Sequence, residues 1–206
     1  MESSTEQDAR SKFFTQSWTV TLPSHPGLKF FRITPSYFDQ WLPLVMDPAN
    51  NELQDTAGKV WDNAAQAEWR GRAQKRYDDL NIAHNGLDIL VELNGKLIGY
   101  GDIYAFNPTE ASVGIILNKE ARGRGIGKLG IQVFTQLGFE LGLEINTGTM
   151  KANGPMRGIM KSLGIEEIEK VVEIPGRGVV AEIEWELKRE DWKSIDMKIE
   201  FGEPVA

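Results

Sequence analysis

The chain has 206 residues, of which 41% are apolar and 26% charged, with a formal net charge of −7 and no cysteine. This length and composition are typical of one soluble domain that buries its own core. The absence of cysteine excludes disulfides, thiolate metal sites and an acyl-cysteine intermediate, and the negative charge disfavours nucleic acid as a partner.

The two histidines and the polar start of the chain argue against further classes of protein, namely metal-dependent and triad enzymes and secreted proteins. His25 and His84 lie far apart without metal-ligand spacing, so we expect no metal and no Ser-His-Asp triad. Residues 1–12 are polar and of mixed charge, and we expect a flexible tail there that lacks the apolar segment of a signal peptide. No stretch is apolar over the length that spans a bilayer. We therefore expect a cytoplasmic protein without membrane contact.

The first part of the chain predicts one strand and two helices. Residues 13–20 form a short leading segment, and the apolar run 28–33 is the first strand, which follows a Pro-Gly pair. Aromatic and aliphatic residues recur at helical spacing over 36–46. Residues 63–81 are rich in Ala, Gln, Glu, Arg and Lys, which favours a partly exposed helix.

The middle of the chain predicts a β-hairpin, a strand and a long helix. Two strand-like runs within 87–106 flank Asn94-Gly95, a dipeptide that adopts the positive φ values of a tight type I′ turn. The apolar run 111–117 is the next strand. It leads through a glycine-rich loop into a helix over 126–141, whose apolar residues recur at steps of three and four.

The end of the chain continues the alternation of strands and helices. We expect a strand over 144–150, a short helix over 155–163 and a final strand pair over 165–174 and 179–187. No linker rich in Pro, Gly or Ser separates two halves. The sequence therefore predicts a single mixed α/β (α+β) domain over 13–206.

The glycine-rich loop carries the chemistry. Residues 122–128 read RGRGIGK and lie between a strand and a helix, where backbone N–H groups and a helix N-terminus bind anionic oxygens. Glycines allow a ligand to approach the backbone closely. Arg122, Arg124 and Lys128 add positive charge, which suits a pyrophosphate or a ribose phosphate.

Two common phosphate-binding motifs do not fit this loop. A nucleotide P-loop requires one more residue of spacing and a hydroxyl where Leu129 stands. A dinucleotide-binding fold places its glycine motif after an early strand, whereas this loop follows a hairpin late in the chain. Both interpretations are therefore disfavoured.

The loop resembles the Arg/Gln-x-x-Gly-x-Gly/Ala motif of the GNAT superfamily of acyl-CoA N-acyltransferases, and residues 122–127 match it fully. The order of hairpin, strand, loop, helix, strand and asparagine-led short helix over about 87–164 is similar too, with 153–164 as the last element. The ending VVAEIEWELKREDWK resembles the ribosomal-protein and drug N-acetyltransferase subgroup, so the similarity covers about 28–193. It implies a central, mostly antiparallel mixed sheet flanked by helices, with a splayed cofactor cleft.

The resemblance implies acetyl-CoA as the acyl-donor cosubstrate and no metal. The amides of 122–128 would hold the pyrophosphate, and the strand 114–117 would pair with the pantetheine arm. A backbone N–H near Ile115 or Ile116 would polarise the thioester carbonyl. The cofactor-binding residues expected on this basis are Ile115, Ile116, Leu117, Arg122, Gly123, Arg124, Gly125, Ile126, Gly127, Lys128 and Asn153.

An acceptor amine must be neutral to attack, so a carboxylate should take its proton. Asp102 and Glu110 are the first candidates for this general base, followed by Glu182 and Glu184.

Some family members protonate the leaving thiolate with a tyrosine on the short helix, but Met160 stands there in this chain. Met156 occupies the place of a serine alternative, so water or Tyr104 is left to supply the proton.

The aromatic residues Tyr37 and Trp41, together with Tyr104, are candidates for contacts with the acceptor. We expect direct attack in a ternary complex by the primary amine of a small molecule or of a protein N-terminus, in a monomer or homodimer. The alternative is a non-catalytic acyl-CoA sensor. Met160 supports this hypothesis, because it stands in place of the tyrosine that acts as the acid.

Overall fold

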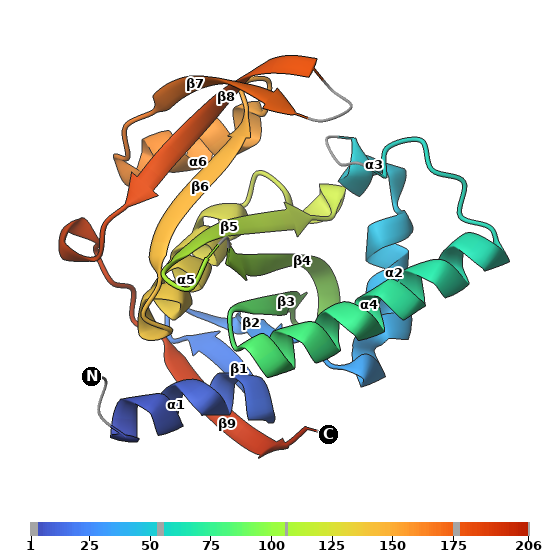
Figure 1. Ribbon diagram of the computed structural model, residues 1–206, viewed down its shortest axis with the longest axis vertical. Helices are drawn as coiled ribbons and strands as arrows, with labels where there is room; N and C mark the ends of the chain where they lie inside the picture. The colour runs from blue at the N-terminus through green and yellow to red at the C-terminus, as the bar shows by residue number, and fades with distance from the viewer. Residues whose placement is uncertain (1–3, 53–55, 106, 175–177, 206) are drawn as a thin grey trace.

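The computed structural model describes residues 4–52, 56–105, 107–174 and 178–205. Its strands form one nine-stranded sheet in the order β7-β8-β6-β5-β4-β3-β2-β1-β9 (Figure 1). The strands are β1 Gln16–Leu22, β2 His25–Arg32, β3 Gly86–Leu93, β4 Lys96–Ala105, β5 Glu110–Leu117, β6 Glu144–Met150, β7 Ile168–Ile174, β8 Gly178–Leu187 and β9 Lys198–Pro204.

The α-helices match the helical segments that the sequence predicts and add two more. They are α1 Ser4–Thr15, α2 Phe38–Met46, α3 Pro48–Asn51, α4 Asn63–Ala83, α5 Ile126–Glu140 and α6 Gly154–Leu163. Short 3-10 turns cover Pro35–Tyr37, Lys119–Ala121 and Arg189–Asp191.

The hairpin between β3 and β4 is confirmed. Asn94 and Gly95 have φ values of 51° and 80°, as a type I′ turn requires, and Leu93 pairs with Lys96 beside them. A register shift between Val91 and Glu92 moves the remaining pairs by one residue. The shift brings Asp88 opposite Asp102.

The start of the chain differs from the expectation. Helix α1 occupies most of the segment 1–12 for which a flexible tail was predicted, and residues 1–3 of that segment lie outside the described residues. Phe13 and Phe14 anchor the helix in the core. Strands β1 and β9 pair with each other outside the predicted core of 28–193. The extent of a single domain over 13–206 stays a prediction.

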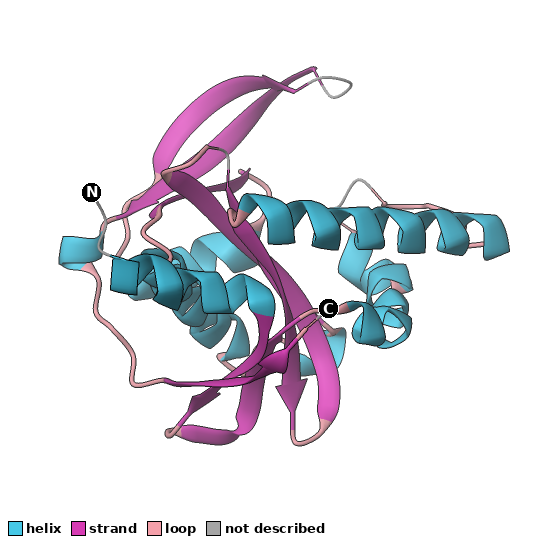
Figure 2. Ribbon diagram, turned by 60° about the horizontal axis from the view of Figure 1, so that its bottom comes forward, coloured by secondary structure: helices cyan, strands magenta, loops and turns pink. Residues whose placement is uncertain are grey.

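Helices cover both faces of the sheet (Figure 2). Helix α5 packs on one face, where Phe134 meets Phe30 edge to face at 5.9 Å. Helices α2 and α4 cover the other face, where the rings of Trp41 and Trp69 are 5.0 Å apart. The core is therefore divided by the sheet, and β4 and β5 run between its two halves.

Strands β5 and β6 part soon after they begin to pair. Their parallel pairing is limited to Glu110 with Glu144 and Ala111 with Ile145, whereas the other edge of β6 pairs with β8 from Ile145 to Met150. The two ribbons diverge in Figure 1. Beyond this point the buried Thr147 donates a hydrogen bond from Oγ1 to the carbonyl of Val113 at 2.8 Å. The expectation of a splayed, mostly antiparallel sheet is confirmed.

Gly101 permits the close approach of β4, β5 and α5, and we expect Gly101→Ala to destabilise the fold. A Cβ there would lie 2.2 Å from the carbonyl oxygen of Gly114 and 2.4 Å from Cε2 of Phe134. Because backbone must move to relieve this clash, the free energy of unfolding should fall by about 1–3 kcal/mol. Urea unfolding measures the change.

Gly71→Ala is the matched control. Gly71 lies within α4, and a Cβ there would meet no atom within 4 Å. This variant should gain about 0.5–1 kcal/mol from helix propensity. Equal effects of the two substitutions would contradict the packing account.

Candidate functional site

The loop before α5 has the geometry of an anion site. Gly123 and Gly125 adopt φ values of +72° and +79°, and Gly125 is the N-cap residue of α5. The first-turn amides of a helix have no intrahelical partner, and the bonding here starts with Leu129 N–H to the carbonyl of Gly125 at 3.2 Å. The amides around Gly127 are therefore available to phosphate oxygens.

Arg122 fastens this loop to the neighbouring segments. Its Nε donates to the carbonyl of Leu117 at 2.8 Å, and its Nη2 donates to the carbonyl of Ala49 at 2.7 Å and to Oδ1 of Asn50 at 3.2 Å. Asn50 also donates to Oδ1 of Asn118 at 2.8 Å. The guanidinium thus ties α3 to the end of β5 and fixes the path of the loop.

The remaining polar residues of the predicted cofactor site hold different positions. Arg124 is exposed on the loop. Lys128 donates from Nζ to the carbonyl of Ser162 at 2.9 Å, near the end of α6. Asn153 caps α6, since its Oδ1 accepts from the Met156 N–H at 3.2 Å. Of the three predicted cations, Arg122 and Arg124 are exposed and Lys128 is half-buried.

The open edge of β5 presents alternate backbone groups. The carbonyls of Val113 and Leu117 face this edge, because Thr147 and Arg122 donate to them from outside the β4–β5 ladder. Backbone groups of a strand alternate in direction, so the N–H and C=O of Ile115 face the same edge. Of the two amides named in the sequence prediction, that of Ile115 is the one directed toward the open edge of β5.

Asp102 lies on β4, which pairs with the other edge of β5, and its side chain is on the face that α4 covers. It pairs with Gly114 of β5, and a Cβ on Gly114 would lie 3.4 Å from its Oδ1. Burial and then the charge of Asp88 raise the pKa of Asp102 to about 6, while Arg76 lowers it. The side chain keeps 41% of its surface accessible. The carboxylate is therefore both reachable and suited to accept a proton near neutral pH.

Arg76 of α4 joins the two aspartates. Its Nε and Nη2 donate to both oxygens of Asp88 at 2.7–3.0 Å, and Nη2 also reaches Oδ2 of Asp102 at 3.2 Å. Burial, and then the charge of Asp102, raise the pKa of Tyr100, so its phenol stays protonated. Sequence reasoning missed Arg76 and Asp88. The signal that could have found them is the presence of two acidic residues, Asp88 and Asp102, on the two strands of the predicted hairpin, because such a pair favours a cation between them.

The other carboxylates have structural partners. Glu110 accepts from Nδ2 of Asn107 at 2.6 Å and of Asn146 at 3.0 Å, at the end of the cleft where β5 and β6 still pair. Glu184 forms an ion pair with Lys170. Glu182 lies over Gly148, with its Oε1 2.9 Å from where a Cβ would be. Asp102 is thus the candidate whose carboxylate lies beside the middle of β5, at Gly114.

The predicted acceptor residues do not converge on one point. Trp41 is buried against Trp69 and lies 5.8 Å from the ring of Tyr100. Tyr37 packs on Phe31 at 5.0 Å. Tyr104 is 47% exposed and lies under the guanidinium of Arg76. Trp41 and Tyr104 therefore border the Asp102 region from two sides.

The short helix offers no acid. Met160 is fully buried in the core, and Met156 packs against the same cluster. A thioether cannot donate a proton, so the proton for the leaving group must come from elsewhere.

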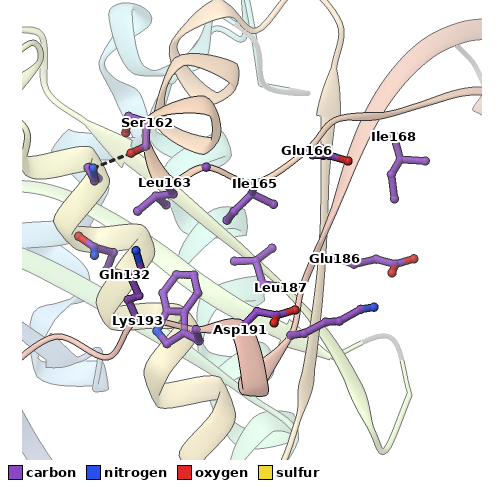
Figure 3. Close-up of a pocket in the computed structure, with 14 residues that line it drawn as sticks. Gln132, Ser162, Leu163, Ile165, Glu166, Ile168, Glu186, Leu187, Asp191 and Lys193 are labelled. Carbon is purple, nitrogen blue, oxygen red and sulfur yellow. Dashed lines mark hydrogen bonds between the residues drawn. The ribbon is translucent and has the colours of Figure 1, made fainter.

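A separate pocket of about 520 Å³ lies on the α5 face of the sheet, where Figure 3 shows α6, α5 and β8 converging. Apolar side chains including Ile165 and Trp192 line it together with charges of both signs, such as Glu166 and Lys193. Lys128 is the predicted site residue on its wall. Asp102 does not line this pocket and lies on the other face of the sheet.

No helix in the described residues is long and apolar enough to cross a membrane. Within the same residues no group of three or more histidines and carboxylates is arranged to hold a metal ion.

Comparison with known proteins gives a family match and a shared fold. The family model described as "Acetyltransferase (GNAT) family" matches residues 47–165, which is more than half of the chain. No curated protein sequence matches the chain.

Three similar solved structures are acetyltransferases. RimL, a ribosomal L7/L12 alpha-N-protein acetyltransferase solved with coenzyme A, has a TM-score of 0.67 at 15% identity, covering 81% of this chain and 96% of that one. The ribosomal-protein-S5-alanine acetyltransferase of Vibrio fischeri has a TM-score of 0.59 at 19% identity, covering 81% and 96%. MccE, a microcin C7 self-immunity acetyltransferase solved with acetyl-CoA and AMP, has a TM-score of 0.62 at 13% identity, covering 78% and 92%. At these identities the likeness shows the shared fold.

The raised pKa of Asp102 predicts how stability depends on pH. The unfolded chain releases this proton near the ordinary pKa of 3.8, whereas the folded chain holds it until about pH 6. Folding stability therefore falls as pH rises through this window. The variant Asp102→Asn has no such proton and so does not lose stability in this way. The difference between its melting temperature and that of the natural protein should therefore increase from pH 4 to pH 6.5 and then level off. A difference that stays constant with pH, in melting scans across this range, would contradict the burial account.

Proposed function

The chain belongs to the GNAT family of acetyltransferases, and on that premise we propose that it moves the acetyl group of acetyl-CoA onto a primary amine of a small molecule or a protein N-terminus. The observation that carries the proposal is the position of Asp102 on β4, with its carboxylate beside Gly114 in the part of β5 whose other edge is open. The amine attacks directly while both substrates are bound.

The donor lies along β5 and its loop. Loop amides around Gly125 and Gly127 receive the pyrophosphate, and the exposed Arg124 adds a positive charge. The amide-bearing pantetheine arm takes the place of the missing neighbouring strand along β5 beyond Ala111. The N–H of Ile115 then donates to the thioester carbonyl oxygen.

The reaction forms one bond and breaks another at the thioester carbon. Asp102, directly or through a water, takes a proton from the acceptor ammonium or from the attacking nitrogen. The nitrogen bonds to the carbonyl carbon, and the developing oxyanion is held by the N–H of Ile115. Collapse of this intermediate breaks the carbon–sulfur bond. Because Met160 is buried, water or Tyr104 protonates the thiolate of coenzyme A.

Both classes of acceptor have support from similar folds. RimL is named as an alpha-N-protein acetyltransferase, and MccE was solved with acetyl-CoA and AMP. Such an acceptor would approach Asp102 between two aromatic groups. Tyr104 is on one side, and Tyr100 with Trp41 packed against it is on the other. We place the reaction in the cytoplasm, without nucleic acid or membrane as a partner.

Asp102→Asn should lower kcat/KM for acetyl transfer by about 10²–10⁴-fold at neutral pH, because the amide cannot accept the proton. Amine-dependent release of the coenzyme A thiol measures the rate across a panel of small amines and peptide N-termini. Glu110→Gln is the control, since Glu110 is bound to Asn107 and Asn146 at the closed end of the cleft. Its effect should be well below that of Asp102→Asn.

Full activity of Asp102→Asn would reject this residue as the base. Binding of acetyl-CoA with no thiol release above the background for any amine would favour the acyl-CoA sensor instead.

A further inference from the structure

Arg76 makes two kinds of contact in the site. Its bidentate contact with Asp88 comprises three donor–acceptor distances of 2.7–3.0 Å, whereas a single contact of 3.2 Å reaches Asp102. The side chain of Asp88 is 12% exposed and that of Asp102 is 41% exposed. The Asp88 pair is therefore the enclosed, fixed part of the cluster, and Asp102 is its accessible end.

The contact with Arg76 also distinguishes the two oxygens of Asp102. Nη2 of Arg76 donates to Oδ2, while Oδ1 is the oxygen next to Gly114 on the cofactor strand. Because the guanidinium that donates it is itself held by the bidentate contact with Asp88, this hydrogen bond restrains the carboxylate of Asp102. Its second oxygen is then directed toward the strand where the amine and the thioester meet.

The groups that face Asp102 set its charge. Asp88 faces it from β3, Arg76 from α4, and the phenols of Tyr100 and Tyr104 stand on either side of it along β4. From β5 the pairing residue is Gly114, which carries no charge. Arg76 is thus the cation that offsets two neighbouring carboxylates.

We propose that Arg76, clamped by Asp88, is a positioning residue that directs Asp102 toward the cofactor strand and maintains its negative charge. This inference rests on the proposed function, in which Asp102 takes the proton of the acceptor amine. Without Arg76, burial and the charge of Asp88 act on Asp102 unopposed, and its pKa rises further. The carboxyl group would then be protonated, and inactive as a base, at neutral pH.

The test is the pH profile of kcat/KM for amine-dependent thiol release. Arg76→Gln should move the acid limb upward by about 1–3 pH units, the usual effect of losing an opposite charge at this distance. Activity lost at pH 7 should return at pH 9. Asp88→Asn removes the like charge and should move the limb downward. Arg76→Lys keeps the positive charge but cannot make the bidentate contact of a guanidinium. The acid limb of its profile should therefore lie near the natural position, with a lower kcat.

Arg70→Gln is the matched control. Arg70 lies on the same helix and pairs at 3.0 Å with a different carboxylate, that of Asp39. This variant loses the same charge and should keep the natural profile. Circular dichroism of each variant checks folding, and Asp88→Asn supplies the test if Arg76→Gln does not fold.

Two results separate this inference from the proposed function. If Asp102→Asn abolishes the acid limb while Arg76→Gln lowers kcat equally at every pH, Arg76 has only a structural role and the inference is overturned. If Asp102→Asn retains the acid limb, the assignment of the base itself fails. The inference requires that Arg76→Gln shifts the limb in the natural background and has no further effect on it in the Asp102→Asn background.

Discussion

The parting of β5 from β6 after two residue pairs is the constraint on which the rest of the structure depends. It leaves strand edge in the middle of a nine-stranded sheet, where backbone groups would otherwise be paired. Thr147 satisfies one carbonyl and Arg122 another, so the edge between them stays open around Ile115. The loop 122–128 begins where this strand ends, so in the proposed function the same strand positions both the anion site and the thioester.

In the proposed function the acceptor amine meets the carboxylate of Asp102, whose ionised form lowers the stability of the fold. Asp102 is directed toward the cofactor strand because glycine at position 114 leaves space beside it. Burial next to Asp88 raises its pKa to about 6, a value that disfavours the ionised folded state yet suits a base near neutral pH. In the proposed function, stability and proton transfer therefore make opposite demands on Asp102, and Arg76 is the cation that offsets its charge.

The sequence was sufficient for features that depend on local chemistry. Asn94-Gly95 predicted the hairpin, and the glycines of 122–128 predicted a loop between a strand and a helix, where Gly123 and Gly125 have positive φ in the structure. Other features depend on long-range contacts. The pairing of β1 with β9 joins the two ends of the chain. The register shift after Val91, which brings Asp88 opposite Asp102, has no local signal, and the clamp by Arg76 exists because of that shift. The fold could be predicted from the sequence pattern and the family resemblance. The cluster of Arg76, Asp88 and Asp102 could not, because it depends on the register between β3 and β4.

An amide-resolved NMR titration of the protein with acetyl-CoA tests the central claim most directly. The account predicts that the amide signals of Ile115, Leu117 and residues 123–128 shift together and saturate with one affinity, because these groups line the open edge and its loop. Shifts confined to Ile165, Glu166 and Trp192 would place the ligand in the pocket on the α5 face and contradict the account.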